Sequence, residues 1–149
     1  TIDHKLDETG LLEAARAADV VVDCSDNFPT RFAVNRACVA ARKPLVSGAV
    51  VRFEGQVSVF RAELPDGPCY ACLYRDTGSE EGDLCSQFGV LAPAAGMIGT
   101  IQAVETLKLL LGIGSTLAGR VLMVDALAME FRSVTLRKDP DCPVCGSKT

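Results

Sequence analysis

Two Cys-x-x-Cys pairs constrain this 149-residue chain more than any other feature of its sequence. Cys69 and Cys72 form the first pair, and Cys142 and Cys145 form the second, close to the end of the sequence. Four thiolates at about 2.3 Å from one ion satisfy tetrahedral zinc, and a gap of two residues lets one tight turn direct both sulfurs at that ion. Because the pairs are far apart in sequence, a shared zinc ion would tie the tail of the chain back onto a central loop.

Two other interpretations of these cysteines stay open at this point. A thioredoxin-like redox pair stands at the start of a helix after a strand, whereas Cys69 follows the loop segment Pro65-Asp66-Gly67-Pro68. The thiols could also be inert. The odd total of seven cysteines argues against a closed set of disulfides, so a reducing compartment such as the cytoplasm is the simpler setting.

Hydrophobic periodicity predicts an α/β fold. Helical spacing over residues 8–18 leads into the β-branched run Val20–Val22, and Pro29 then opens a helix that extends to about residue 42. A further strand starts at Pro44, and this order of helix, strand, helix and strand is typical of a parallel α/β sheet. The rest of the pattern predicts a hairpin around Glu54-Gly55, a long loop over 63–87, a helix over 92–111 and strands over 121–124 and 129–136.

Charge and composition exclude several classes of function. The net charge is −4 and no basic run occurs, so the chain is a poor candidate for binding nucleic acid or an anionic membrane. Residues 84–104 carry no formal charge and are long enough to span a bilayer. Their proline, glycines and glutamines instead favour a buried helix, whose small residues we expect to pack closely against a neighbour: Ala92, Ala95, Gly99 and Ala103.

Asp26 follows the strand at Val20–Val22, at the edge where open α/β sheets bind their ligands. A carboxylate there can hold Mg²⁺ against phosphate oxygens. The alternative is that Asp26 caps the next helix, and the local sequence by itself favours the cap. Both roles are compatible if Asn27 or Ser25 caps the helix while Asp26 faces the ligand.

Three cysteines stand outside the two pairs. Cys85 precedes the long helix, where a helix N-terminus favours a reactive thiolate and the acidic residues before it oppose one, so a reactive thiol and an inert loop thiol are both open. Cys24 and Cys38 lie in apolar segments, and we expect both in the core. The sequence contains neither a G-x-G-x-x-G motif after a strand nor a Walker A loop, so any phosphate-binding glycines lie outside these residues.

Five segments, in order, resemble the ThiF/MoeB/HesA family, the bacterial relatives of ubiquitin-activating enzymes. They are VVVDCSDNFPTRFAVNRACV, PLVSGAVVRFEGQVSVF, PCYACLY, GVLAPAAGMIGTIQAVETLKLLLG and CPVCG. The resemblance implies a doubly wound, Rossmann-like α/β sheet of the ubiquitin-activating-enzyme type, and usually a homodimer. Since the family's glycine-rich nucleotide loop is not visible, residues 1–149 look like the C-terminal part of one such domain.

The resemblance also implies an activity: ATP-dependent adenylylation of the C-terminal glycine of a ubiquitin-fold sulfur carrier, ThiS-like or MoaD-like, for thiamine or molybdopterin synthesis. By position, Asp26 and Asn27 match the family residues that contact Mg²⁺ and ATP. The four paired cysteines match its structural zinc ligands. Cys85 matches a cysteine that ThiF-type members use in a sulfur linkage to the carrier. The alternative is a non-catalytic, zinc-stabilised module that binds a ubiquitin-like partner.

Overall fold

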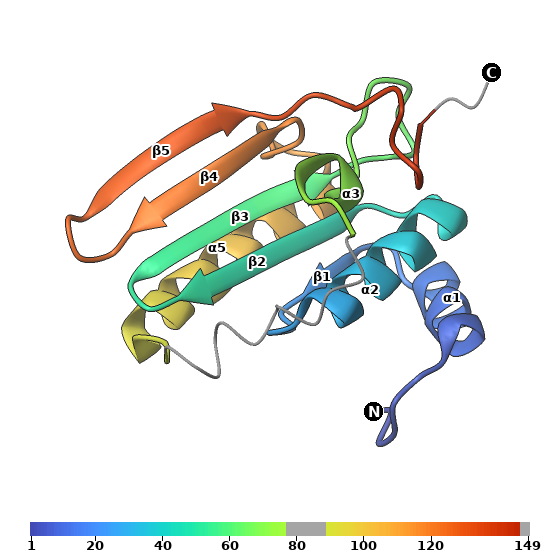
Figure 1. Cartoon of the computed structure of the whole chain (residues 1–149), viewed down its shortest axis with the longest axis horizontal. Helices are drawn as coiled ribbons and strands as arrows, with labels where there is room; N and C mark the ends of the chain where they lie inside the picture. Colours follow the sequence, from blue (N-terminus) through green and yellow to red (C-terminus); the bar gives the residue numbers. More distant parts are fainter. Residues whose placement is uncertain (77–88, 147–149) are drawn as a thin grey trace.

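A five-stranded sheet with helices on both faces forms the body of the computed structural model, which describes residues 1–76 and 89–146 (Figure 1). The strands lie across the sheet in sequence order: β1 (Val21–Asp23), β2 (Leu45–Val51), β3 (Glu54–Phe60), β4 (Arg120–Asp125) and β5 (Glu130–Thr135). Strands β1 and β2 are parallel, and each later pair is antiparallel. The α/β class is confirmed. The sheet in this part of the chain is mixed, however, and the predicted parallel winding occurs only at β1-α2-β2.

The helices lie where the periodicity predicts them, to within one residue at each end. They are α1 (Glu8–Ala17), α2 (Phe28–Ala41) and α5 (Ala92–Leu111). Among the described residues, one further short helix, α3 (Tyr70–Leu73), lies inside the stretch predicted as a loop. It is a single turn that starts after Cys69 and contains Cys72, so it is too short for a hydrophobic pattern to indicate it.

The hairpin between β2 and β3 turns earlier than predicted. Val51 pairs with Glu54, so Arg52 and Phe53 form a two-residue turn and Glu54-Gly55 already belong to β3. Arg52 has a φ of 55°, in the left-handed region that such tight turns require. The alternation of apolar and polar residues identifies the two strands, whereas the turn position depends on the backbone of Arg52.

Each face of the sheet has its own core. Leu45 of β2 points to the side covered by α2 and α3, where Phe32, Phe60 and Tyr70 pack around it. The next residue, Val46, points to the opposite side and packs with Val57, Val59 and Ile98 beneath α5. Successive residues of a strand face opposite sides, so burial of both Leu45 and Val46 identifies a sheet covered on both faces.

Helix α5 is long and apolar enough to cross a membrane by length and composition, with a mean hydropathy of 1.3. Its buried residues, among them Ile98, Gln102 and Glu105, line the sheet, and Glu105 accepts a 2.7 Å hydrogen bond from the Leu117 amide. These contacts show that one face of α5 packs against the sheet, although only 22% of its apolar window is buried in this chain. The predicted close packing of the small residues is wrong within this chain, because Ala92, Ala95, Gly99 and Ala103 are exposed.

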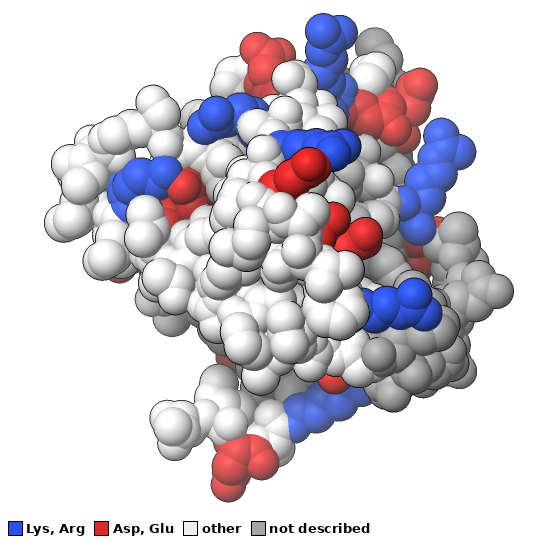
Figure 2. Space-filling view, turned by 90° about the vertical axis from the view of Figure 1, so that its left-hand side faces the viewer, with Lys and Arg blue, Asp and Glu red and all other residues white. Residues whose placement is uncertain are grey.

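The end of the molecule that carries the β4–β5 turn is apolar. Figure 2 views this end and shows a broad central area without Lys, Arg, Asp or Glu. Large side chains at and near the turn are exposed, with relative exposures of 75% for Leu127, 63% for Met129 and 52% for Phe131. An apolar surface of this kind is typical of a region that another polypeptide covers.

Candidate functional site

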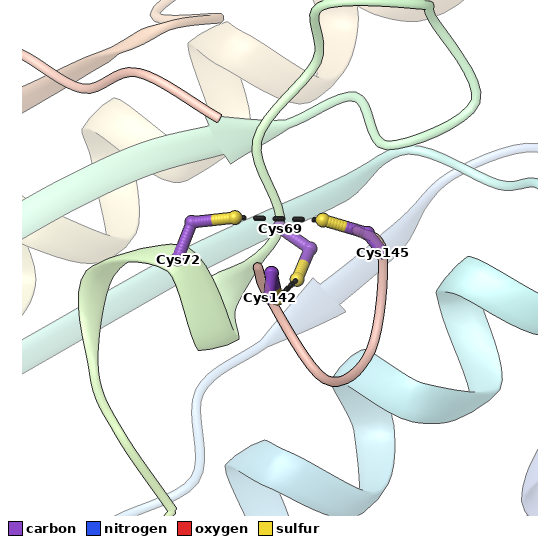
Figure 3. Close-up of side chains that lie close together, drawn as sticks. All are labelled: Cys69, Cys72, Cys142 and Cys145. Atoms are coloured by element: carbon purple, nitrogen blue, oxygen red, sulfur yellow. Dashed lines mark hydrogen bonds between the residues drawn. The ribbon is translucent and has the colours of Figure 1, made fainter. Parts of the chain in front are cut away.

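The four paired cysteines come together in space (Figure 3). All four Sγ atoms lie within 4.8 Å of one another, with Cys69 at 3.7 Å from Cys142 and Cys72 at 3.4 Å from Cys145. Sulfurs about 2.3 Å from a central zinc, in a tetrahedron, lie about 3.8 Å apart, whereas disulfide sulfurs lie about 2.05 Å apart. The spacing fits a tetrahedral metal, and no disulfide joins these four residues. Both close contacts link one pair to the other, which favours metal binding over redox chemistry within one Cys-x-x-Cys pair.

Two tight turns present these sulfurs. Cys69 stands at the N-cap of α3 and its carbonyl accepts the Cys72 amide at 3.0 Å; the Cys142 carbonyl accepts the Gly146 amide at 2.9 Å. Asn35 of α2 then fixes the first turn: its Nδ2 donates to Cys69 Sγ at 3.6 Å, and its Oδ1 accepts from the Tyr70 amide at 2.9 Å. Such outer contacts orient metal ligands and tune their affinity.

The protonation chemistry of the cluster also suits a cation. Burial raises the pKa of Cys69 to about 11 and also raises the pKa of Cys145. At Cys142 burial acts in the same direction, but hydrogen bonds from the Cys145 and Val144 amides outweigh it and lower the pKa. Without a positive charge, the Cys69 and Cys145 sulfurs therefore remain thiols at neutral pH. A soft dication that binds four sulfurs stabilises the thiolates, and an S₄ donor set is typical of zinc.

Asn27, not Asp26, caps helix α2. The Asn27 Oδ1 accepts the Thr30 amide at 2.9 Å, and the Asn27 Nδ2 donates to Asp26 Oδ1 at 3.2 Å. Asp26 itself is exposed at the carboxyl end of β1. The local preference for Asp26 as a cap is therefore not realised, and its carboxylate is available to a ligand.

Hydrogen bonds within the loop and from helix α5 hold the loop that carries Asp26. The Asp23 Oδ1 accepts hydrogen bonds from the Ser25 amide at 2.9 Å and from the Ser25 hydroxyl at 2.7 Å. From α5, the Gln102 Nε2 donates to the Asp23 carbonyl at 2.8 Å. These contacts give the loop a defined shape before any ligand binds.

Two cavities meet at this loop, and both are lined by Asp26 and Arg31. The first, which we call the aromatic cavity, is about 310 Å³ and has Phe28, Tyr70, Tyr74 and Met123 among its walls. The second, the small-residue cavity, is about 470 Å³ and is lined in part by Ser25, Gly48, Ala95 and Gly99. Asp26 thus lies where two ligands could approach each other.

Sequence reasoning missed Arg31 and Gln102. Arg31 is buried with 6% exposure, and its guanidinium donates to the Ser25 carbonyl. The sequence did indicate that Arg31 is buried, because Arg31 shares a helical stripe with the apolar residues Phe32 and Cys38. Gln102 likewise interrupts the apolar face of α5, and its amide proves to bridge to β1.

The predictions for the three cysteines outside the Cys-x-x-Cys pairs differ in their result. Cys38 is buried at 2% exposure, as predicted, and burial raises its pKa to about 12. The prediction for Cys24 is wrong: it is exposed at the end of β1, where its thiol donates to Gln102 Oε1 at 3.6 Å. It follows the last residue of a three-residue strand, so the apolar context ended before it. Cys85 lies outside the described residues.

With this geometry in hand, comparison with known proteins identifies the family. The model of the ThiF family matches residues 1–144. The chain belongs to the ThiF family.

Curated relatives of this ThiF-family chain are similar over nearly its whole length. It is 46% identical over 147 residues to the SAMP-activating enzyme E1 of Haloferax volcanii, 45% over 148 residues to the sulfur carrier protein adenylyltransferase of Thermus thermophilus, and 44% over 142 residues to the molybdopterin-synthase adenylyltransferase of Escherichia coli. These matches cover 97%, 97% and 95% of the chain but 53%, 55% and 56% of the relatives. The chain therefore spans about half the length of the curated relatives that it matches.

Solved structures share the fold of this ThiF-family chain. A crystal structure of E. coli MccB with AMPCPP and MccA has a TM-score of 0.78 at 21% identity, covering 98% of this chain and 45% of that one. MccB with ATP has a TM-score of 0.74 at 20% identity, covering 94% and 42%. At this level of identity the likeness establishes the fold alone.

Proposed function

We propose that this ThiF-family chain is part of an enzyme that uses Mg-ATP to adenylylate the C-terminal glycine of a ubiquitin-fold sulfur carrier. The observation that carries the proposal is the placement of Asp26. Its carboxylate is exposed at the carboxyl end of β1 and lines two cavities. Because Asn27 caps helix α2, the Asp26 carboxylate is not needed for capping. Relatives named as adenylyltransferases support the reaction class.

In this mechanism Asp26 would hold Mg²⁺, which would neutralise charge on phosphate oxygens. Asn27 orients the Asp26 carboxylate through its 3.2 Å hydrogen bond and fixes the start of α2. Asp23 and Gln102 keep the loop in place. The protein contributes positioning and electrostatics, which account for most of the catalysis of phosphoryl-type transfer.

The four cysteines would hold a structural zinc ion in the same protein. Their sulfur spacing and donor set fit the metal. Zinc there would connect helix α3 with the segment that follows β5. Helix α3 packs against α2, and its residue Tyr70 lines the aromatic cavity. Its role is to hold the walls of the site, since all four tetrahedral positions are taken by protein ligands.

We propose that the chain is the C-terminal half of one adenylyltransferase domain, which accords with its coverage of about half of each relative. The carrier is ThiS-like or MoaD-like, and the product serves thiamine or molybdopterin synthesis. A cytoplasmic homodimer is expected, and the apolar end shown in Figure 2 offers a surface for such an interface. Cys85 is retained as the candidate for the later sulfur linkage.

The test is to replace Asp26 in the complete protein and to measure pyrophosphate release with ATP and a carrier that ends in Gly-Gly. We expect Asp26→Asn to reduce release by about two orders of magnitude or more, because a metal-anchoring charge is lost. Zinc content and the thermal midpoint should not change.

Asp19→Asn is the matched control, since Asp19 is exposed just before the opposite end of the same strand. Unchanged release in Asp26→Asn would remove Asp26 from the site. If the unmodified protein binds the carrier but releases no pyrophosphate, the alternative of a non-catalytic, zinc-stabilised module that binds a ubiquitin-like partner is favoured instead.

A further inference from the structure

Arg31 is a buried cation that forms no ion pair with any residue in the ranges 1–76 and 89–146. Its guanidinium donates to the Ser25 carbonyl, which uses only part of the five N–H donors that a guanidinium carries. Buried charges are normally paired, because removing an isolated ion from water is costly. An arginine with 6% exposure and no ion pair among the described residues is therefore suited to binding an incoming anion.

Tyr70 is a second buried polar group at the same place. It has 1% exposure, and its hydroxyl has no hydrogen-bond partner among the residues that the structure describes. Burial raises the pKa of Tyr70 to about 12, and the neighbouring Arg31 guanidinium partly opposes that rise. At neutral pH the phenol is thus protonated and able to donate, so two donors lie close together on one cavity.

The cavity that Arg31 and Tyr70 share is otherwise largely apolar. Phe28, Tyr74 and Met123 form much of the wall of this aromatic cavity, and Asp26 lies at its junction with the small-residue cavity. Apolar walls with a guanidinium and a phenol suit a peptide that ends in a carboxylate, because arginine binds carboxylates through two parallel hydrogen bonds. A nucleotide phosphate is the other oxyanion that these donors could accept.

We propose that Arg31, with Tyr70 beside it, binds the C-terminal carboxylate of the carrier in the aromatic cavity. This assignment rests on the proposed function and makes Arg31 a catalytic residue of that reaction. One carboxylate oxygen forms a bond to the α-phosphorus of ATP, the bond from that phosphorus to the bridging oxygen breaks, and pyrophosphate leaves with its electron pair. Arg31 offsets the repulsion between the carboxylate and the phosphates as they approach.

The experiment compares two forms of one carrier that ends in Gly-Gly: the natural carboxylate and a C-terminal carboxamide. Calorimetry without ATP measures their binding to the complete protein. The unmodified protein should bind the carboxylate about tenfold or more tightly than the amide, as expected for a charged hydrogen bond. Arg31→Met should abolish this difference, and Arg31→Lys should restore part of it.

Two further variants separate binding from folding. Arg36→Met removes a charge from the same helix, at an exposed residue paired with Glu8 at 3.4 Å, and should keep the full preference for the carboxylate. Tyr70→Phe should weaken carboxylate binding several-fold while raising the thermal midpoint of the free protein, since a buried, unpartnered hydroxyl is removed. A merely structural role for Tyr70 would not combine these two effects.

Kinetics then separate the two possible anions. At saturating ATP, Arg31→Lys should raise KM for the carrier about tenfold, with KM for ATP changed less than about twofold. A raised KM for ATP with an intact carboxylate preference would assign Arg31 to the nucleotide and overturn the proposal. Equal effects of Arg31→Met and Arg36→Met would overturn it too. An unmodified protein that neither binds nor activates any carrier contradicts the proposed function, and the inference falls with it.

Discussion

At the scale of single residues, Gly48 of β2 and Gln102 of α5 act as a unit. The Gln102 amide donates to the carbonyl of Asp23 at 2.8 Å and to that of Val46 at 3.4 Å. It reaches them because Gly48 has no side chain: a Cβ there would lie 2.4 Å from the Gln102 Cδ. The missing side chain at Gly48 in β2 therefore permits Gln102 of α5 to form a hydrogen bond with the end of strand β1.

We predict that Gly48→Ala lowers the free energy of unfolding by about 1–3 kcal/mol, because it displaces the buried Gln102 amide from both carbonyls. In a Gln102→Ala background the same change should cost much less, and denaturant titration of the four proteins measures this coupling. Gly96→Ala is the control: a Cβ at Gly96 meets nothing within 4 Å, and alanine in a helix should stabilise the protein slightly. Additive costs for Gly48→Ala and Gln102→Ala would show that the two residues are independent.

At the scale of elements, the segment after β5 depends on the cysteine cluster for its position. Residues 136–146 contain no helix or strand, and their contacts include the Cys142 and Cys145 sulfurs and a 3.0 Å hydrogen bond from Lys138 to the Pro65 carbonyl. Cys142 is buried in the same core as Tyr70 and Phe60. A metal at this point would therefore join the end of the chain to the wall of the aromatic cavity.

We expect one zinc ion per chain by elemental analysis of protein purified without chelator. Cys142→Ser should reduce zinc binding, lower the thermal midpoint by several degrees and increase amide exchange over residues 136–146, because metal binding is linked to folding. Cys24→Ser makes the same chemical change at an exposed residue outside the cluster and should leave zinc content unchanged. Purified protein that carries no zinc would contradict the assignment.

At the scale of the whole molecule, the candidate site is open to groups from outside this chain. Strand β1 lies at the edge of the described sheet, and Asp26 in the loop that follows it lines two cavities. The sequence has no glycine-rich phosphate loop, and phosphates are commonly held by the backbone amides of such loops. Phosphate binding would then require further binding groups in addition to Asp26 and its neighbouring residues.

We predict that the 149-residue chain alone binds ATP only weakly and releases no pyrophosphate, even with a carrier present. Loss of the phosphate-cradling amides should cost more affinity than the loss of one carboxylate. Isothermal calorimetry with ATP and Mg²⁺ provides the measurement, and the complete protein is the reference. Micromolar ATP affinity in the isolated chain would contradict the prediction.

The sequence alone determined the features that depend on local chemistry. Helix limits follow from periodicity and caps, and α5 (Ala92–Leu111) agrees with its prediction at both ends. The two Cys-x-x-Cys pairs predicted one tetrahedral cluster, because ligand spacing is set within single turns. The compatibility of an Asn27 cap with a free Asp26 was also foreseeable from the sequence.

Only the tertiary structure decided what depends on segments far apart in the chain. Three features depend on how α2, α5 and the sheet are placed: the burial of Arg31 without an ion pair among the described residues, the bridge from Gln102 to β1, and the exposure of Cys24. The antiparallel order of β3, β4 and β5 likewise follows from long-range pairing. Local sequence fixes backbone preference and side-chain chemistry, whereas burial and partners arise only when distant surfaces pack together.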